Sequence, residues 1–204
     1  MRTDELPFSI GTSHPYTANQ DMDLISGREY MITDDKRFIP EGGRAATGFK
    51  KRVRLVRNTS GVTLLPKRAV TFKSGTNLKE VDGYCDLSSE LIAGIVDEFL
   101  TNGVPDGEFF FVTVEGPTLF TNDPAASGNN SYSIGDRLSA VTAAASTSST
   151  TSGRIGKPTL VAPTDVTSAG SFFNQANNWV MTALSASTTG NTNAEKLGMV
   201  RYNY

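Results

Sequence analysis

A seven-residue run near the middle of the chain is apolar on both of its faces, and this limits the folds open to the protein. The run is EFFFVTV, at 108–114. In a strand, its first and third phenylalanines lie on one face, and Phe110, Val112 and Val114 lie on the other. Such a strand is covered on both sides, as in a barrel or a sandwich. We expect Gly116-Pro117 to end it.

Other short segments have strand patterns and are separated by polar loops. We expect strands at 49–57, 62–72, 91–97, 137–141 and 197–204. The longest loops, rich in Ser and Thr, span 143–153 and 185–194. Many short strands with polar loops indicate an all-β protein. We therefore expect a small β-barrel-like or sandwich-like domain over residues 49–204.

The segment 91–100 also fits a helix, since its apolar pairs recur at helical spacing and Ser88 or Ser89 could cap it. Against a helix, Gly94 costs about 1 kcal/mol in a helix interior, and the neighbouring segments have strand patterns. We therefore favour a strand at 91–97.

Residues 1–48 show no sustained helical or strand period, so we expect an extended, irregular N-terminal arm. Ordering it costs about 1–2 kcal/mol per residue in backbone entropy, so its apolar residues must be buried somewhere. The arm either wraps around the protein's own core or reaches onto a partner. The candidates for these contacts are Phe8, Ile10, Tyr16, Leu24, Ile25 and Tyr30.

Positive charge collects in one part of the chain. The window 36–79 holds 12 of the 19 lysines and arginines but only one of the 21 acidic residues, Glu41. Its net charge is therefore +11, and that of the remainder is −13. This division suits docking onto a charged surface or stacking against copies of the same chain.

The basic window has the pattern of a β-hairpin. Its first strand is expected to place Phe49, Val53 and Leu55 on the core face, with the alternating cations about 7 Å apart on the other. Asn58-Thr59-Ser60-Gly61 suits a turn, and Pro66 kinks the second strand. One alternative is that the cations form a solvated strand face. The other is that they form a docking surface, because no acid nearby in the sequence neutralises them. The docking candidates are Lys50, Arg52, Arg54, Arg57, Lys67 and Arg68.

The sequence offers little for catalysis or metal binding. His14, the one histidine, lies in the irregular N-terminal segment, away from any recognisable nucleophile. One cysteine, Cys85, excludes a disulfide within the chain and a His/Cys metal cluster, and we expect it to be buried. Neighbouring carboxylates such as Asp97 and Glu98 face opposite sides of a strand. We expect no enzyme activity, catalytic residue, metal or cofactor.

Membranes and nucleic acids are not expected partners. No apolar run approaches the roughly 20 residues of a membrane span, and the N-terminus lacks the apolar core of a secretion signal. We expect a soluble protein made in the cytoplasm. Nucleic acid is disfavoured because Phe49 and Phe72, the aromatics near the charges, are expected on the core face. The chain is also mildly acidic, with a net charge of −2.

Five segments follow one another within about residues 49–160. They are RLVRNTSGVTLLPKRAV at 54–70, Ala93–Asp97, the Phe-rich strand up to Gly116-Pro117, Ile134–Asp136 and Arg154–Gly156. Over these residues the layout resembles that of the tailed-bacteriophage capsid decoration, or cement, proteins. The resemblance implies a structural virion protein on the outside of the capsid. It implies binding to the major capsid protein, association with copies of itself as a homotrimer, and no cofactor.

Two other functions fit the composition. Long Ser/Thr/Asn loops suit a tail or fibre component that contacts the host. A β-type glycan-binding module is the second alternative, although the chain has a single tryptophan, Trp179, and sugar-binding platforms usually show several exposed aromatics.

Overall fold

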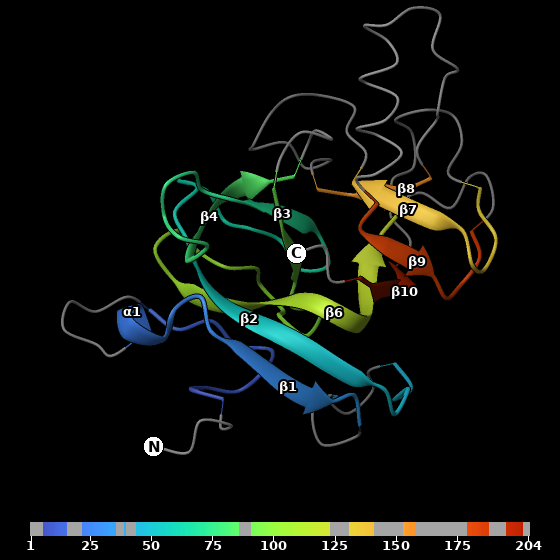
Figure 1. Cartoon of the computed structure of the whole chain (residues 1–204), viewed down its shortest axis with the longest axis horizontal. Helices are drawn as coiled ribbons and strands as arrows, with labels where there is room; N and C mark the ends of the chain where they lie inside the picture. Colours follow the sequence, from blue (N-terminus) through green and yellow to red (C-terminus); the bar gives the residue numbers. More distant parts are fainter. Residues whose placement is uncertain are drawn as a thin grey trace, which may run out of the picture.

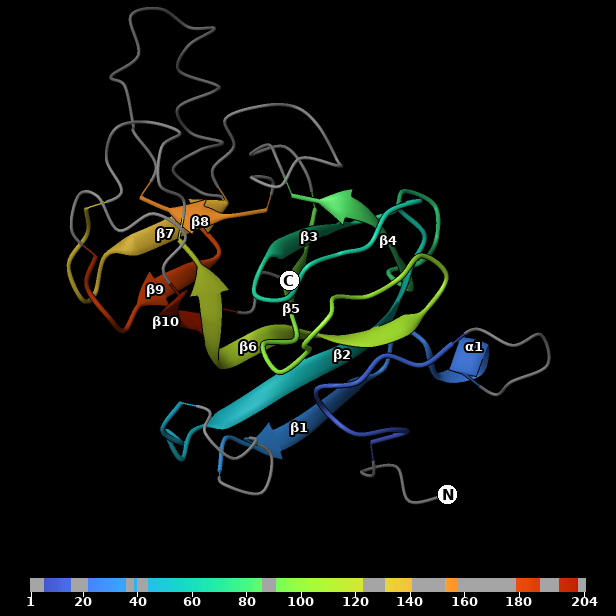
Figure 2. The ribbon, with the colours of Figure 1, turned by 180° about the vertical axis from the view of Figure 1, so that it is seen from behind.

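The computed structural model describes residues 6–15, 22–35, 39, 44–85, 91–122, 131–140, 153–157, 179–187 and 195–201. Within these ranges the regular secondary structure consists of strands and one short helix, joined by turns and loops (Figures 1 and 2). The elements are α1 Met22–Ile25, β1 Glu29–Thr33, β2 Lys50–Asn58, β3 Ala69–Phe72, β4 Glu80–Tyr84, β5 Ile92–Val96, β6 Phe109–Thr121, β7 Arg137–Ala140, β8 Ile155–Gly156, β9 Met181–Ala183 and β10 Glu195–Val200.

The strands form one mixed sheet in the order β1-β2-β4-β3-β5-β6-β10-β9-β7-β8, and β2 also pairs with β6. This extra pairing joins β2, β4, β3, β5 and β6 into a partial ring. All pairs are antiparallel except β2–β4, which is parallel. The expected all-β, barrel-like fold is thus confirmed. The expected polar loops at 143–152 and 188–194 lie outside the described residues.

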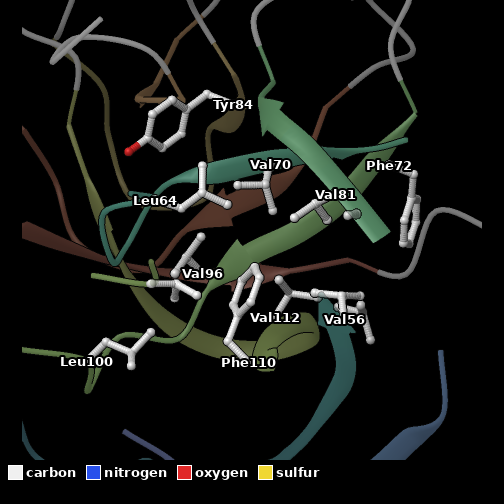
Figure 3. Packing of buried hydrophobic residues seen from close by; sticks show 13 residues of the cluster. Val56, Leu64, Val70, Phe72, Val81, Tyr84, Val96, Leu100, Phe110 and Val112 are labelled. Atoms are coloured by element: carbon white, nitrogen blue, oxygen red, sulfur yellow. The ribbon is translucent and has the colours of Figure 1, made fainter. Parts of the chain in front are cut away.

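The ring encloses the first hydrophobic core. Figure 3 shows side chains from all five ring strands pointing toward one another, among them Val56, Val70, Val81, Val96 and Phe110. A second core is formed by residues of β3, β5, the second half of β6 and β7–β10, and it includes the buried Cys85, as expected. The predicted burial of β6 on both faces is also confirmed. Its odd-numbered phenylalanines belong to a third core, on the outside of the ring, and Phe110, Val112 and Val114 to the ring interior.

Strand β6 does not end at Gly116-Pro117, contrary to our expectation. It changes partner there: residues up to Glu115 pair with β2, and Gly116 to Thr121 pair with β10. Gly116 has a φ of +102°, which favours glycine. A Cβ at this position would lie 2.6 Å from the carbonyl oxygen of Lys50. The glycine therefore permits both the bend and the close approach of β2.

Gly116→Ala should destabilise the protein by about 3 kcal/mol or more, because it combines an unfavourable φ with a backbone clash. Gly135→Ala is the matched control, since Gly135 has a φ of +92° but a Cβ at this position would have no atom within 4 Å. It should cost about 1–2 kcal/mol. Urea unfolding of both variants measures the difference, and equal losses would show that the close approach carries no energetic weight.

The expected hairpin between the two halves of the basic window is wrong. The turn chemistry is present, since the Asn58 side chain donates to the carbonyl oxygens of Val62 (2.8 Å) and Val104 (2.9 Å). However, β2 pairs with β1, β4 and β6, and β3 pairs with β4 and β5. The two edges of β2 are already occupied, so the chain after the turn crosses to the far side of the ring.

The segment 91–97 is a strand, as favoured over a helix. Gly94 in β5 has a φ of +143°, and a Cβ there would lie 2.6 Å from the carbonyl oxygen of Thr113. The glycine that argued against a helix therefore allows close packing of β5 on β6. Strands β7 and β10 also confirm the predicted strands at 137–141 and 197–204 within the described residues.

The N-terminal segment is more regular than expected and is part of the fold. Residues 29–33 form edge strand β1, which pairs with β2 along its whole length. Four of the six candidate contact residues, Phe8, Ile10, Ile25 and Tyr30, pack in the third core against Val53, Leu55, Phe109 and Phe111. Leu24 is 74% exposed, and Tyr16 lies outside the described residues. The described parts of the segment thus wrap around the protein's own core.

Adjacent residues of β1 test whether this segment stabilises the fold. Ile32 is 8% exposed and Met31 is 53% exposed. Ile32→Ala should lower the free energy of unfolding by about 2–4 kcal/mol, and Met31→Ala by less than about 0.5 kcal/mol. Chemical denaturation with circular dichroism distinguishes them. A negligible loss in Ile32→Ala would mean that the N-terminal segment adds little to the core.

Candidate functional site

Cations of β2 form ion pairs with acids that are distant in the sequence. The expectation that no acid neutralises them is therefore wrong. Arg54 is buried and forms an ion pair with Glu29 of β1. Arg52 lies between two carboxylates, 3.6 Å from Glu29 and 3.4 Å from Glu115 of β6. Only Lys50, at the start of β2, is exposed.

The other docking candidates are also held within the fold. Lys67 forms an ion pair with Glu195 of β10, and the Nε of Arg57 donates to the carbonyl oxygen of Gly107 at 3.2 Å. Arg68 is buried, and its guanidinium carbon lies 5.5 Å from the centre of the Tyr84 ring. Burial lowers the pKa of Arg68. The six cations therefore do not form one continuous basic surface.

A buried network of charges, missed at the sequence level, lies on the other face of β2. The Nζ of Lys51, with 2% of its side chain exposed, is 2.9 Å from the fully buried carboxylate of Glu98. Arg44 binds the same carboxylate with two nitrogens, both at 2.8 Å. It also binds Asp34 through two nitrogens, at 2.8 and 2.7 Å. One arginine thus makes two bidentate pairs, a geometry that its planar fork favours.

The network determines the charge states of its members. Burial raises the pKa of Glu98, but the charge of Lys51 and the hydrogen bonds of Arg44 outweigh it, so the pKa lies below its ordinary value. The pKa of Asp34 is lowered in the same way by Arg44 and Thr47, against the effect of burial. Burial dominates at the neighbouring Asp97 and raises its pKa, although Lys51 opposes the change.

The network is suited to stabilising the fold rather than to catalysis. The Glu98 carboxylate accepts from Arg44, Lys51 and the backbone N–H of Leu119 (3.1 Å), so protein donors surround it. Asp97 accepts from the backbone N–H groups of Gly11 (2.6 Å) and Phe99 (3.2 Å). These contacts join the N-terminal segment, β2, the residues after β5 and the second half of β6.

Glu98→Gln should lower the free energy of unfolding by about 3 kcal/mol at neutral pH, because it leaves Lys51 buried without its full countercharge. Glu115→Gln is the control; Glu115 is 45% exposed beside Arg52, and its loss should cost less than about 1 kcal/mol. Since the folded pKa of Glu98 lies below its ordinary 4.5, its contribution is complete above that pH and is lost as the pH falls through the folded pKa.

Urea unfolding of wild type and Glu98→Gln from pH 7 to pH 3 checks both statements. The difference in stability should be constant near neutral pH and should narrow below about pH 4.5. A difference that does not depend on pH would contradict the assignment of Glu98 as an ionised partner.

The features that bear on other chemistry are the metal-ligating side chains, the surroundings of His14 and a cavity. The described residues contain no group of three or more His, Cys, Asp and Glu side chains placed to hold a metal ion. The backbone of His14 pairs with Phe109 of β6, and its ring is partly buried against Phe8. A cavity of about 590 Å³ beside β3 and β4 is lined by residues that include the polar Asp82, Lys73, Thr71 and Ser74. The Nζ of Lys73 lies 3.8 Å from the carboxylate of Glu80.

Two large apolar side chains are exposed near the open edge of the sheet, Met31 on β1 and Phe49 just before β2. Phe49, expected on the core face, is instead 59% exposed, and Met31 is 53% exposed. The backbone N–H of Asp34 donates to the carbonyl oxygen of Phe49 (2.8 Å), and Met31 pairs with Arg52 in the sheet. β1 is the last strand of the sheet, and no described segment pairs with its outer edge. Because side chains alternate between the two faces of a strand, the register places Met31 and Lys50 on one face and Phe49 on the other. We call these three residues, which flank the open edge on both faces, the edge patch.

Comparison of the sequence with models of known protein families and with curated proteins found no match. Among the described residues, no helix is long and apolar enough to cross a membrane.

Proposed function

We propose that the chain is a structural virion protein that binds the outside of a phage capsid and stabilises contacts between major capsid protein subunits. The resemblance to capsid decoration proteins supports this proposal, and so does an all-β fold whose ionic network holds its own strands together. The observation that carries it is the edge patch, which offers apolar contact and one exposed cation at an open sheet edge. The patch is the docking site in this proposal.

The composition of the edge patch suits a protein contact. Natural sheets usually protect an open edge, because unpaired backbone groups invite another chain. Here Met31 of the edge strand β1 and Phe49, just before the neighbouring β2, are both more than half exposed. Apolar anchors supply most of the binding energy of an interface, whereas an exposed charge such as Lys50 mainly steers association. Many equivalent sites on one shell turn modest affinity per copy into a stable coat.

Co-sedimentation with expanded, empty phage heads tests the function. Wild type should bind saturably, at a fixed ratio to coat subunits. The double variant Met31→Ala/Phe49→Ala should bind at least about tenfold more weakly, which corresponds to about 1.4 kcal/mol. Lys50→Glu should associate more slowly and with altered salt dependence.

Ile134→Ala is the matched control, since Ile134 is also a large apolar residue, 68% exposed, but lies far from β1 in the sheet order. It should bind as wild type does. Absence of saturable binding by wild type would overturn the function. Normal binding by the double variant would remove the edge patch from it.

A further inference from the structure

Two arginines converge on the only tryptophan of the chain. Arg137 begins β7, Arg201 follows β10, and Trp179 precedes β9, the strand between them. The guanidinium carbons lie 4.7 Å and 4.4 Å from the centre of the Trp179 ring. Backbone hydrogen bonds fix this geometry, since Arg201 donates to Val180 (3.1 Å) and Val180 to Leu138 (2.8 Å).

These arginines differ from the cations of β2 in their surroundings. Both are exposed, and neither forms an ion pair with a carboxylate of the described residues. Asp136, the nearest carboxylate in sequence to Arg137, is 2.9 Å from Lys157. Two positive charges held at most about 9 Å apart repel each other, since each distance is measured to the same ring. An anionic ligand would relieve this repulsion.

The stacking also restricts which ligand fits. Guanidinium groups over the ring compete with a sugar or a base for its faces, and leave N–H groups available to solvent. The guanidinium N–H donors suit carboxylates. Because stacking already fixes the two arginine side chains, less side-chain entropy is lost when a ligand binds. Alternate residues of an extended chain lie about 7 Å apart, a spacing that the two guanidinium groups can bridge. A nucleic acid would instead meet a chain with a net charge of −2.

We propose that Arg137, Trp179 and Arg201 form a second docking site, which binds an extended acidic protein segment with carboxylates two residues apart. This inference rests on the proposed function, where such a segment would belong to the coat protein. The site lies across β6 from the edge patch, on the part of the sheet formed by β7–β10 (Figures 1 and 2).

Trp179 supplies the measurement, because it is the only tryptophan and its fluorescence reports directly on this site. The full chain is titrated with a peptide of alternating Glu and Ser, and with the matching Gln/Ser peptide. We expect a saturable change with the Glu peptide alone, weakened by salt. Arg137→Ala/Arg201→Ala should bind about five- to tenfold more weakly by calorimetry. Arg28→Ala, which removes another exposed arginine, should bind as wild type does.

Three results would overturn the site. They are an equal response to the Gln/Ser peptide, unchanged affinity in the double arginine variant, and tighter binding of polyphosphate than of the Glu peptide. Co-sedimentation separates this failure from that of the proposed function. Wild type that binds shells but no Glu peptide keeps the function and loses the site. Binding to the peptide but not to shells keeps the site and removes the function.

Discussion

The bend of β6 at Gly116 is the constraint on which the rest of the structure depends. The first half of β6 pairs with β2 in the ring, and its second half pairs with β10, which begins the β7–β10 part of the sheet. This division is possible only if the backbone turns at one residue while β2 passes within van der Waals contact. A side chain there would meet the Lys50 carbonyl oxygen and the Lys51 Cα. Each of the three hydrophobic cores includes at least one residue of β6.

The bend in β6 also supplies one hydrogen-bond donor to the buried ionic network. Burying an ion pair carries a large desolvation cost, which only good geometry and further hydrogen bonds offset. The bend places the N–H of Leu119 on Glu98 at 3.1 Å, and Arg44 and Lys51 supply the remaining donors. Such a network adds less to stability than an apolar core of the same size would. Its directional contacts instead favour one register between the N-terminal segment, β2 and β6.

The sequence predicted the fold better than the candidate site. A continuous apolar run identified β6, because a strand buried on both faces is apolar throughout. Alternation identified the start of β2, and Gly94 together with the neighbouring strand patterns favoured β5 over a helix. Strand partners were not predictable, since pairing of β2 with β1 and β6 depends on residues about 20 to 60 positions away. The same limit explains the error over the basic window: Glu29, Glu115 and Glu195 neutralise its cations from outside it. Phe49 was wrongly expected on the core face because it lies just before the first residue of β2, where strand alternation no longer predicts which side chains are buried.

The sheet order has a consequence for the time at which the protein folds during synthesis. β2 cannot complete its pairing until β6 exists, and about 50 residues separate the end of β2 from the start of β6. At about 5–20 residues per second, translation of that interval takes several seconds. During this time one edge of β2 remains open on the ribosome. Because β2 carries five lysines and arginines among its nine residues, charge repulsion between nascent chains would oppose their aggregation until the ring closes.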